Sequence, residues 1–478
     1  MKPSRRALRL DRIILVALFV VLTMVTGFRL AVLTPIGQVA DEPAHIARAA
    51  ALLHGQLLGQ RVPFTPPGKS TVTVPAVRVD YGLLNASIGE MGASCAHPGT
   101  AVRTADLPWT RNQIIDIDYN TVQYFPALYL PGTIGIAVGR LFGQRPLAAL
   151  FSGRIGMLLA YVLIGALAVG VARFGAGVIF ATLSLPMALS LGASFNQDGL
   201  LIALSALAGA ILTIDPVRHP KTRWWFLPIF MLVIASKPPY GLLLFMALTP
   251  LAAPHRWRRA FLIAIWGIPP LIWVVVMAHV SLMPYLLGPY KPGPLWPGQA
   301  GAVFTTTAPL AQLRVLTADP LRIVTLTVGL LIDSGGFLIK SGIGMLGWLT
   351  VDLARWAYVG WGLALAAAGA GVIAARASDG ARWNWLDSVF SIVLVSCSVI
   401  AIELAVYLSW DKVGSAVIYG PQGRYYLLFL PFLMLAIPRL GGRFSRVMVA
   451  ASVVPAVMMA VIDMFYLPGL MAQRFCLG

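Results

Sequence analysis

The sequence predicts an all-α polytopic membrane protein of about 11–13 transmembrane helices. Of its 478 residues, 58% are hydrophobic and only 11% are charged, whereas soluble domains carry about 25% charged residues. Mean hydropathy is +0.80, and apolar segments recur from one end of the chain to the other. This composition excludes a disordered chain, a disulfide-rich secreted domain and a soluble enzyme.

The first element expected is a transmembrane helix over residues 13–33. This apolar run is longer than the hydrophobic region of a signal peptide, and the tripeptide Gln-Val-Ala at residues 38–40 makes a poor cleavage site. We therefore predict an uncleaved signal anchor with a cytoplasmic N-terminus. The basic residues that precede it are Lys2, Arg5, Arg6, Arg9 and Arg12.

Residues 34–150 form the large external loop, which is rich in Pro, Gly and polar residues and is expected to contain short helices. The loop ends with an apolar run at residues 122–138. We predict that this run does not cross the membrane alone, and that it forms an interfacial or re-entrant element or half of a hairpin. A second external loop is expected near residues 284–320.

Residues 151–478 are predicted to hold the remaining transmembrane helices, so that the chain forms a single integral membrane domain. A helix needs about 20 apolar residues to cross the hydrocarbon core, and several of the segments are shorter than 17 residues. These are expected to be tilted, broken or re-entrant. The apolar segments fall at 155–172, 177–194, 199–214, 224–236, 239–253, 260–283, 321–335, 337–350, 355–375, 386–409, 425–438 and 446–466.

Clusters of basic residues in the short loops predict the orientation. The excess of 18 basic over acidic residues is attributed to the positive-inside rule and to anionic lipid rather than to nucleic acid. With the run at 122–138 not crossing alone, the clusters all fall on the cytoplasmic side. They are Arg218, Lys221 and Arg223; Arg256, Arg258 and Arg259; Arg376 and Arg382; and Arg439, Arg443 and Arg446.

Four polar clusters then share the outer side, at residues 41–45, 196–199, 237–240 and 420–426. Ionisable groups at membrane depth are costly, and they usually pair with one another or line a site or pathway. We expect these four clusters to converge on one outward-facing cavity. The alternative for each is structural, since aspartates cap helices and long basic side chains reach for head groups.

The first cluster is expected to begin a helix. Asp41 suits the N-cap, Pro43 is tolerated in the first turn, and the residues up to Leu53 favour helix. Asp41, His45 and Arg48 would share one face, because they are spaced i, i+4 and i+7. Glu42 would point about a quarter turn away.

This set of groups suits sugar transfer from a lipid phosphate. A carboxylate can act as general base for an acceptor hydroxyl. Arg and Lys can stabilise the departing phosphate. A second carboxylate can hold the base, the acceptor or a divalent cation. The same groups would also suit a transporter or flippase of a lipid-linked sugar, although transporter sites lie near the membrane midplane on broken helices. A non-catalytic envelope assembly protein is the third alternative.

At these residues the chain resembles the GT-C superfamily of polyprenyl-phosphate-sugar glycosyltransferases, which have an acidic pair after the first span. It looks more closely like a bacterial family of membrane proteins of unknown function. Members of that family carry the motifs Asp-Glu-Pro-x-His, Asn-x-Asp, Lys-Pro-Pro-Tyr and Gln-Gly-Arg-Tyr. The matching residues here are 41–45, 196–198, 237–240 and 422–425.

The GT-C resemblance implies an inverting transferase of 11–13 spans in the plasma membrane, with its site facing outward. It implies a polyprenyl-phosphate sugar as donor and a glycan, lipid or protein of the cell envelope as acceptor. Asp41 or Glu42 would be the general base, with Asp198 as a partner. It leaves open whether the site needs Mg²⁺ or Mn²⁺, for which Asp41, Glu42 and Asp198 would be the ligands. The residues expected to bind substrate are His45, Arg48, Asn196, Asp198, Lys237, Tyr240, Gln422, Arg424 and Tyr425.

Overall fold

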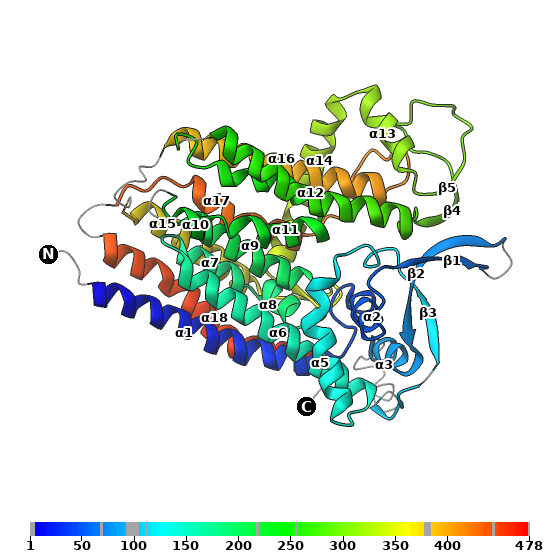
Figure 1. Cartoon of the computed structure of the whole chain (residues 1–478), viewed down its shortest axis with the longest axis horizontal. Coiled ribbons are helices and arrows are strands. Elements are labelled where there is room, and N and C mark those ends of the chain that lie inside the picture. Colours follow the sequence, from blue (N-terminus) through cyan, green and yellow to red (C-terminus); the bar gives the residue numbers. More distant parts are fainter. Residues whose placement is uncertain are drawn as a thin grey trace.

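The computed structural model describes residues 5–66, 70–91, 105–110, 112–216, 219–253, 256–376, 384–441 and 445–476. Its long helices run along one axis, and a small sheet with short helices lies at one end (Figure 1). The all-α polytopic fold class is therefore confirmed. In the described residues, seven helices are long and apolar enough to cross a membrane. They are α1 (Arg5–Leu33), α6 (Pro146–Val171), α12 (Arg256–Val280), α14 (Leu321–Ile343), α15 (Arg355–Ala374), α16 (Trp385–Ser409) and α18 (Ser445–Phe475).

The other predicted spans are shorter or broken helices. Pro186 interrupts one of them, and the Pro238-Pro239 pair separates two others. Nearly every residue of α7, α8 and α9 is buried, which is why these segments are apolar on all sides. The short segments are α7 (Ala176–Ser184), α8 (Pro186–Gly192), α9 (Asp198–Leu212), α10 (Pro220–Arg223), α11 (Phe226–Ser236), η2 (Pro238–Leu248), η3 (Gly423–Phe429) and α17 (Leu430–Ala436).

Two predicted segments, 321–335 and 337–350, are a single element. Helix α14 runs through the first segment and into the second, and it ends at Ile343 with Gly344 as its C-cap. After it, β6 (Met345–Leu346) pairs with β7 (Val351–Asp352). The prediction of a separate second span was wrong, because the glycines at positions 335 and 336 do not interrupt the helix.

The apolar run at 122–138 forms half of a helical hairpin, one of the arrangements predicted for it. It contains η1 (Pro126–Tyr129) and leads into α5 (Leu130–Leu141), which packs against α6. Glycines allow the close approach: a Cβ on Gly135 would lie 2.3 Å from the carbonyl oxygen of Ser152. One on Gly156 would lie 2.2 Å from that of Pro131.

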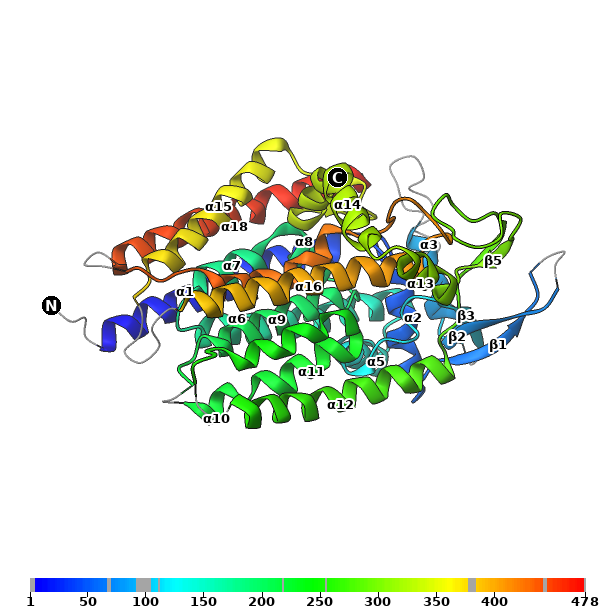
Figure 2. The same ribbon diagram turned by 90° about the horizontal axis from the view of Figure 1, so that it is seen from above.

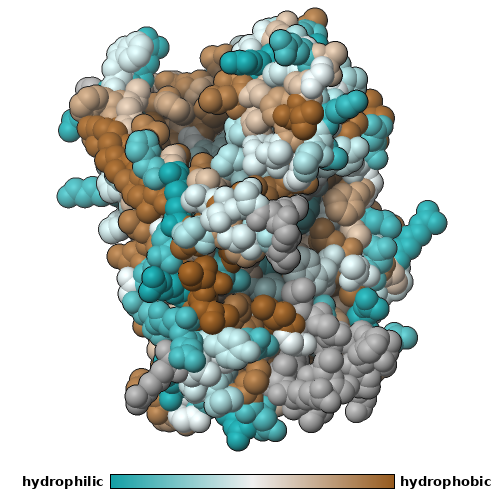
Figure 3. All heavy atoms as spheres, turned by 90° about the vertical axis from the view of Figure 1, so that its right-hand side faces the viewer, coloured by the Kyte–Doolittle hydropathy of each residue, from teal (hydrophilic) through white to brown (hydrophobic). Residues whose placement is uncertain are grey.

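Residues 34–150, the predicted large external loop, contain a sheet as well as the predicted short helices α2 (Glu42–Leu53) and α3 (Tyr81–Met91). Strands β1 (Gln60–Phe64), β2 (Val72–Asp80) and β3 (Gln113–Ile117) form an antiparallel sheet in the order β1-β2-β3. The sheet was not predicted. The second external loop holds β4 (Leu286–Tyr290), β5 (Phe304–Thr306) and helix α13 (Pro309–Ala318). Figure 3 shows this end of the molecule, where hydrophilic and hydrophobic residues are mixed.

The described basic clusters meet at the opposite end, beside the N-terminus (Figure 2). Arg12 donates to the carbonyl oxygen of Ala172 at 2.8 Å, and Arg446 pairs with Asp11 at 2.5 Å. Near the other end of the same two helices, Arg29 donates to the carbonyl oxygen of Met464, so α1 and α18 run parallel. Arg218, Arg382 and Arg443 lie outside the described residues. The clustering agrees with the predicted alternation, while the side of the membrane stays a prediction.

Candidate functional site

The four polar clusters meet around a chain of four charged side chains. Lys237 Nζ lies 2.6 Å from Asp198 Oδ1, and Asp198 Oδ2 lies 3.6 Å from Arg424 Nε. Arg424 Nη2 in turn donates to Asp41 Oδ2. The Asp198 and Arg424 side chains are buried, Lys237 is 14% exposed and Asp41 is 32% exposed. Asp41 is thus the most accessible member of this set, which we call the charge chain.

Asp41 takes an unusual backbone conformation at the start of α2. It occupies the predicted N-cap position, but its φ is 62° and its side chain makes no capping hydrogen bond. Aspartate is one of the few residues other than glycine that tolerate the left-handed region. The conformation leaves the carboxylate to bind Arg424 instead of its own helix. Residues held in this way are concentrated at functional sites.

The Asn-x-Asp-Gly segment fixes the first residue of α9. Asn196 Oδ1 accepts from the Asp198 amide at 2.9 Å, and Asn196 Nδ2 donates to the carbonyl oxygen of Ala40 at 2.9 Å. One side chain therefore ties Asp198 to the residue next to Asp41. A Cβ on Gly199 would lie 2.5 Å from the amide nitrogen of Gly192, so α8 and α9 could not pack as closely with a larger residue.

The Lys-Pro-Pro-Tyr segment connects to the Gln-Gly-Arg-Tyr segment. Lys237 ends α11, because the two prolines that follow cannot continue an α-helix. Tyr240 Oη donates to the carbonyl oxygen of Tyr425 at 2.7 Å. The Tyr425 ring lies 4.4 Å from Lys237 Nζ and 5.4 Å from the Arg424 guanidinium carbon. This ring supports both cations through cation–π contacts.

Gly423 brings the loop before Arg424 against α14. Its amide donates to Ser341 Oγ at 2.8 Å. A Cβ at this position would lie 1.9 Å from the carbonyl oxygen of Leu338, so no larger residue fits. Gln422 Oε1 is buried without a hydrogen-bond partner among the described residues. An acceptor of this kind is available to a ligand.

The lengths of the short helices place the charge chain below the level of the sheet. From the end that carries the basic clusters, α11 has 11 residues before Lys237 and α9 has 15 residues, counting Asp198. At about 1.5 Å per residue, these helices span roughly 16 and 22 Å of a hydrocarbon core about 30 Å thick. The segment that contains the sheet therefore lies on the far side of the charge chain from the basic clusters, and the ends of the broken helices meet at the charge chain.

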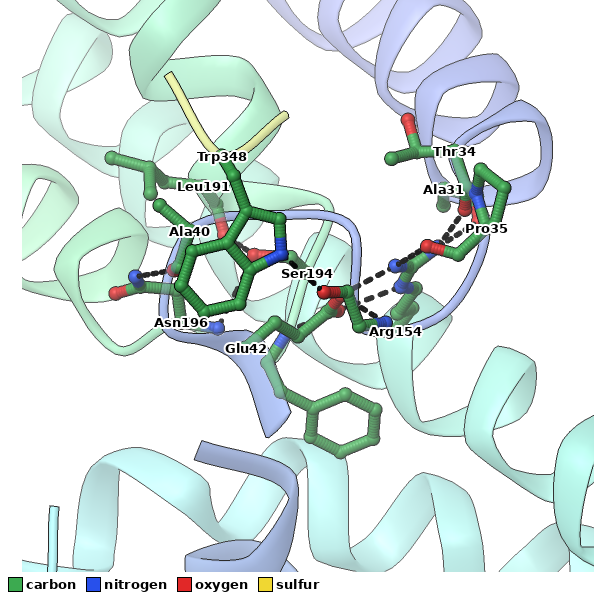
Figure 4. Close-up of polar contacts among 12 residues, drawn as sticks. Ala31, Thr34, Pro35, Ala40, Glu42, Arg154, Leu191, Ser194, Asn196 and Trp348 are labelled. Carbon is green, nitrogen blue, oxygen red and sulfur yellow. Dashed lines mark hydrogen bonds and ion pairs between the residues drawn. The ribbon is translucent and has the colours of Figure 1, made fainter. Parts of the chain in front are cut away.

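Glu42 lies in a different environment from its neighbour Asp41 (Figure 4). It forms a two-point ion pair with Arg154 of α6, with Nε–Oε1 at 2.8 Å and Nη2–Oε2 at 2.5 Å. The amides of Gly37 and Phe195 also donate to it, at 2.9 and 3.2 Å. Both charged side chains are fully buried. All four donors converge on Glu42, so this carboxylate has no free face for an acceptor hydroxyl.

Arg154 also holds the end of α1. It donates to the carbonyl oxygens of Ala31 at 2.8 Å and Pro35 at 3.0 Å, and to that of Thr34. The set of predicted site residues omits Arg154. The signal that could have revealed it is a single arginine beside an apolar segment, since a charge in such a place needs a buried partner.

His45 and Arg48 share the predicted face of α2 but have different surroundings. His45 Nδ1 lies 2.7 Å from Tyr129 Oη, and its ring stacks on that of Tyr124 at 6.1 Å between centroids. Burial lowers the pKa of His45 to about 4, so it is neutral at physiological pH. Arg48 donates to the carbonyl oxygens of Leu57 at 2.6 Å and Tyr124 at 3.2 Å. Arg48 thus positions the backbone around Tyr124 rather than lining the charge chain.

A cavity of about 430 Å³ adjoins the charge chain between α12, η2, α16 and the segment at 119–124. Its wall is largely apolar and aromatic, with Trp273, Tyr285 and Trp410 among its lining residues. Lys237 and Tyr425 line the same cavity, so one positive charge of the chain is exposed to it. The sequence prediction included Tyr240 and Tyr425, which also line the cavity, but not Trp273, Tyr285 and Trp410.

The predicted metal ligands do not fit a divalent cation. Asp41 binds Arg424, Asp198 binds Lys237, and Glu42 binds Arg154. Among the described residues, no group of three or more His, Cys, Asp and Glu side chains is arranged to hold a metal ion. The carboxylates here have basic side chains as their partners.

Comparison with known proteins identifies a family. A family model described as "Predicted membrane protein (DUF2142)" matches residues 24–436, well over half of the chain. All four motifs of the charge chain lie within the matched residues. No curated protein and no solved structure matches the chain.

Proposed function

The chain belongs to the DUF2142 family of predicted membrane proteins, and we propose that it is a glycosyltransferase. In this proposal it transfers a sugar from a polyprenyl-phosphate donor to a cell-envelope acceptor on the outer face of the membrane. The observation that carries the proposal is the charge chain, one member of which, Lys237, lines an apolar, aromatic cavity. Neither a purely apolar pocket nor a solvated charged surface would suit an amphipathic donor of this kind.

The donor phosphate would bind the two cations. Arg424 uses Nη2 for Asp41, while its Nε has no hydrogen-bond partner among the described residues. Arg and Lys near a departing phosphate stabilise the charge that develops as the anomeric bond breaks. The aromatic cavity beside Lys237 would take the sugar and the first prenyl units, since rings such as Trp273 offer apolar faces.

Asp41 would be the general base. It is the most exposed carboxylate of the set, whereas Glu42 is saturated by four donors. The acceptor hydroxyl loses its proton to Asp41 and its oxygen attacks the anomeric carbon. The bond from that carbon to the phosphate oxygen breaks, and the lipid phosphate leaves with the electron pair. Glu42 serves in this scheme as a positioning residue that fixes the start of α2.

The outward orientation has two supporting observations. The described basic clusters lie at the end opposite the charge chain, as the positive-inside rule expects for a cytoplasmic end. Cys476, directly after α18 at the end nearer the sheet, is disulfide-bonded. Disulfides persist in oxidising compartments, which supports an extracytoplasmic location for that end.

The test is transfer from a polyprenyl-phosphate sugar by the purified full chain in proteoliposomes. Asp41→Asn should lower turnover by at least about 100-fold, the contribution of a general base, with the protein still folded. Asp352→Asn is the matched control, because Asp352 also pairs with a basic side chain, Lys340, but is half-exposed and is not part of the charge chain. Unchanged turnover in Asp41→Asn would remove Asp41 from the proposed chemistry.

A flippase for the same lipid-linked sugar is the second candidate. The observation that favours it is the position of Asp198 and Lys237 at the ends of short, broken helices within the bundle, which is how many transporters build their sites. The two functions separate on the product. A newly formed glycosidic bond identifies the transferase, and movement of intact donor across a sealed membrane identifies the flippase.

A further inference from the structure

The charge chain is formally neutral without any metal ion. Asp41 and Asp198 contribute two negative charges, and Lys237 and Arg424 contribute two positive charges. His45, which also lies close to them, is uncharged at neutral pH because burial lowers its pKa to about 4. Each carboxylate of the chain is therefore already balanced by a basic side chain, and no metal ion is needed to neutralise it.

The oxygen atoms that a metal would need are already engaged. Mg²⁺ requires near-octahedral oxygen ligands at about 2.0–2.1 Å, and Lys237 Nζ already lies 2.6 Å from Asp198 Oδ1. The second oxygen of Asp198 faces Arg424, which also binds Asp41. Nδ1 of His45 is taken by Tyr129. A metal would have to displace both cations from the carboxylates before it could bind.

The same cations offer what a metal ion supplies to a phosphate. Lys237 lines the cavity. Arg424, its neighbour in the charge chain, faces Asp198 with an Nε that has no hydrogen-bond partner among the described residues. Both are held against the Tyr425 ring, so their positions are set before a ligand arrives. The unpaired Gln422 Oε1 nearby could accept from a ligand hydroxyl.

We propose that Lys237 and Arg424 form a metal-independent binding site for a prenyl phosphate monoester, in which they take the place of a divalent cation. This inference rests on the proposed function for the choice of lipid phosphate over other anions. It extends that function by assigning the class of ligand. It also infers, from the arrangement of the carboxylates and cations, that binding requires no metal ion.

The experiment measures binding to the purified full chain in detergent, by ligand-induced shifts of the thermal unfolding midpoint. The probes are farnesyl phosphate, inorganic phosphate, farnesol and MnCl₂, each with and without EDTA. Farnesyl phosphate should raise the midpoint equally in EDTA and in MnCl₂. Farnesol and MnCl₂ alone should leave it unchanged. An equal response to inorganic phosphate would assign the site to free phosphate and overturn the lipid part of the proposal.

Lys237→Met should raise the Kd for farnesyl phosphate by roughly 10–100-fold, the loss expected for one charge-assisted hydrogen bond. Lys340→Met is the matched control, because Lys340 also pairs with an aspartate and lies over a tyrosine ring, but on an exposed surface. Should Lys237→Met not fold, Lys237→Arg keeps the charge and should bind without metal.

A saturable shift with MnCl₂ alone that Asp198→Asn abolishes would overturn the proposal, as would farnesyl phosphate binding that requires MnCl₂. The outcome is separate from that of the transfer assay. Metal-free binding without transfer would remove the enzymatic proposal and leave this site in place.

Discussion

Substituting Glu42 by Gln should destabilise the protein, whereas substituting its neighbour Asp41 by Asn should not. Gln keeps the shape of Glu42, but its side-chain NH2 group would replace one carboxylate oxygen. That NH2 would then face N–H groups of Arg154, Gly37 or Phe195, which are themselves hydrogen-bond donors. Arg154 would then be a buried charge without a counterion.

The magnitude follows from the two environments. Breaking a buried ion pair by removing one partner costs about 3–5 kcal/mol. The carbonyl oxygens that Arg154 retains from Ala31, Thr34 and Pro35 place the expected loss near the lower end, at about 3 kcal/mol. Asp41 is one-third exposed, and Arg424 keeps Asp198 at 3.6 Å when Asp41 is neutralised. Asp41→Asn should therefore cost about 1 kcal/mol or less.

The assay is thermal unfolding in detergent, followed by tryptophan fluorescence, with elution as a monodisperse peak as the check on folding. Asp106→Asn is the control, because it removes an aspartate–arginine pair that lies on the surface. A double-mutant cycle with Arg154→Met should show coupling, since the second substitution removes the uncompensated charge. Wild-type stability in Glu42→Gln, or an equal loss in Asp41→Asn, would refute the assignment of Glu42 to structure.

Two further predictions concern packing and pH. Gly423→Ala should lower the free energy of unfolding by about 1–3 kcal/mol and lower transfer activity, because the new Cβ would lie 1.9 Å from the Leu338 carbonyl oxygen. Gly336→Ala is the control, since nothing lies within 4 Å of a Cβ at that position. Equal unfolding midpoints for the two variants would contradict the close packing at Gly423. Burial lowers the pKa of His45 from 6.5 to about 4, so the unfolded chain binds more protons in that window and stability should fall as pH drops from 6.5 toward 4. His45→Gln should weaken this dependence in unfolding midpoints measured across that range, and an unchanged slope would mean that His45 is not buried in neutral form.

The sequence predicts the positions of the four motifs well because the chain has few charged residues. In a chain with 11% charged residues, ionisable groups inside apolar surroundings must find one another. This argument brings Asp198, Lys237 and Arg424 together without knowledge of the fold. It cannot say which carboxylate pairs with which cation, because that depends on side-chain positions across four separate segments.

The different roles of Asp41 and Glu42 could not be derived from the sequence. Both are carboxylates at the start of one helix, and the helical geometry separates them only by about a quarter turn. The partner that distinguishes them, Arg154, lies 112 residues from Glu42. The sheet of the external loop was missed for a related reason: its strands β2 and β3 are separated by α3 and by more than 30 residues in all.

Breaks in the helices explain how charged groups reach the interior of the bundle. A continuous transmembrane helix would place its termini at the two membrane surfaces, whereas Pro238-Pro239 and the turn before Asp198 place helix ends part of the way across. Polar backbone at such ends is tolerated only where it is buried in protein or lines a cavity. The prolines and glycines of the motifs are thus as necessary to the site as the charged residues they accompany.

The cost of burying charge separates the functional cluster from the structural one. A buried ion pair contributes little net stability, since an apolar replacement of similar volume is often as stable. The Glu42–Arg154 pair makes five further hydrogen bonds to the backbone and does not line the cavity. The number of segments that it joins accounts for its presence. The charge chain is different, because Lys237 lines the cavity and Arg424 Nε and Gln422 Oε1 lack hydrogen-bond partners among the described residues. Polar groups without hydrogen-bond partners add no stability to the protein alone, and a ligand that binds them would give them a role. For this reason the charge chain, rather than the more completely bonded Glu42 cluster, is where the chemistry should be sought.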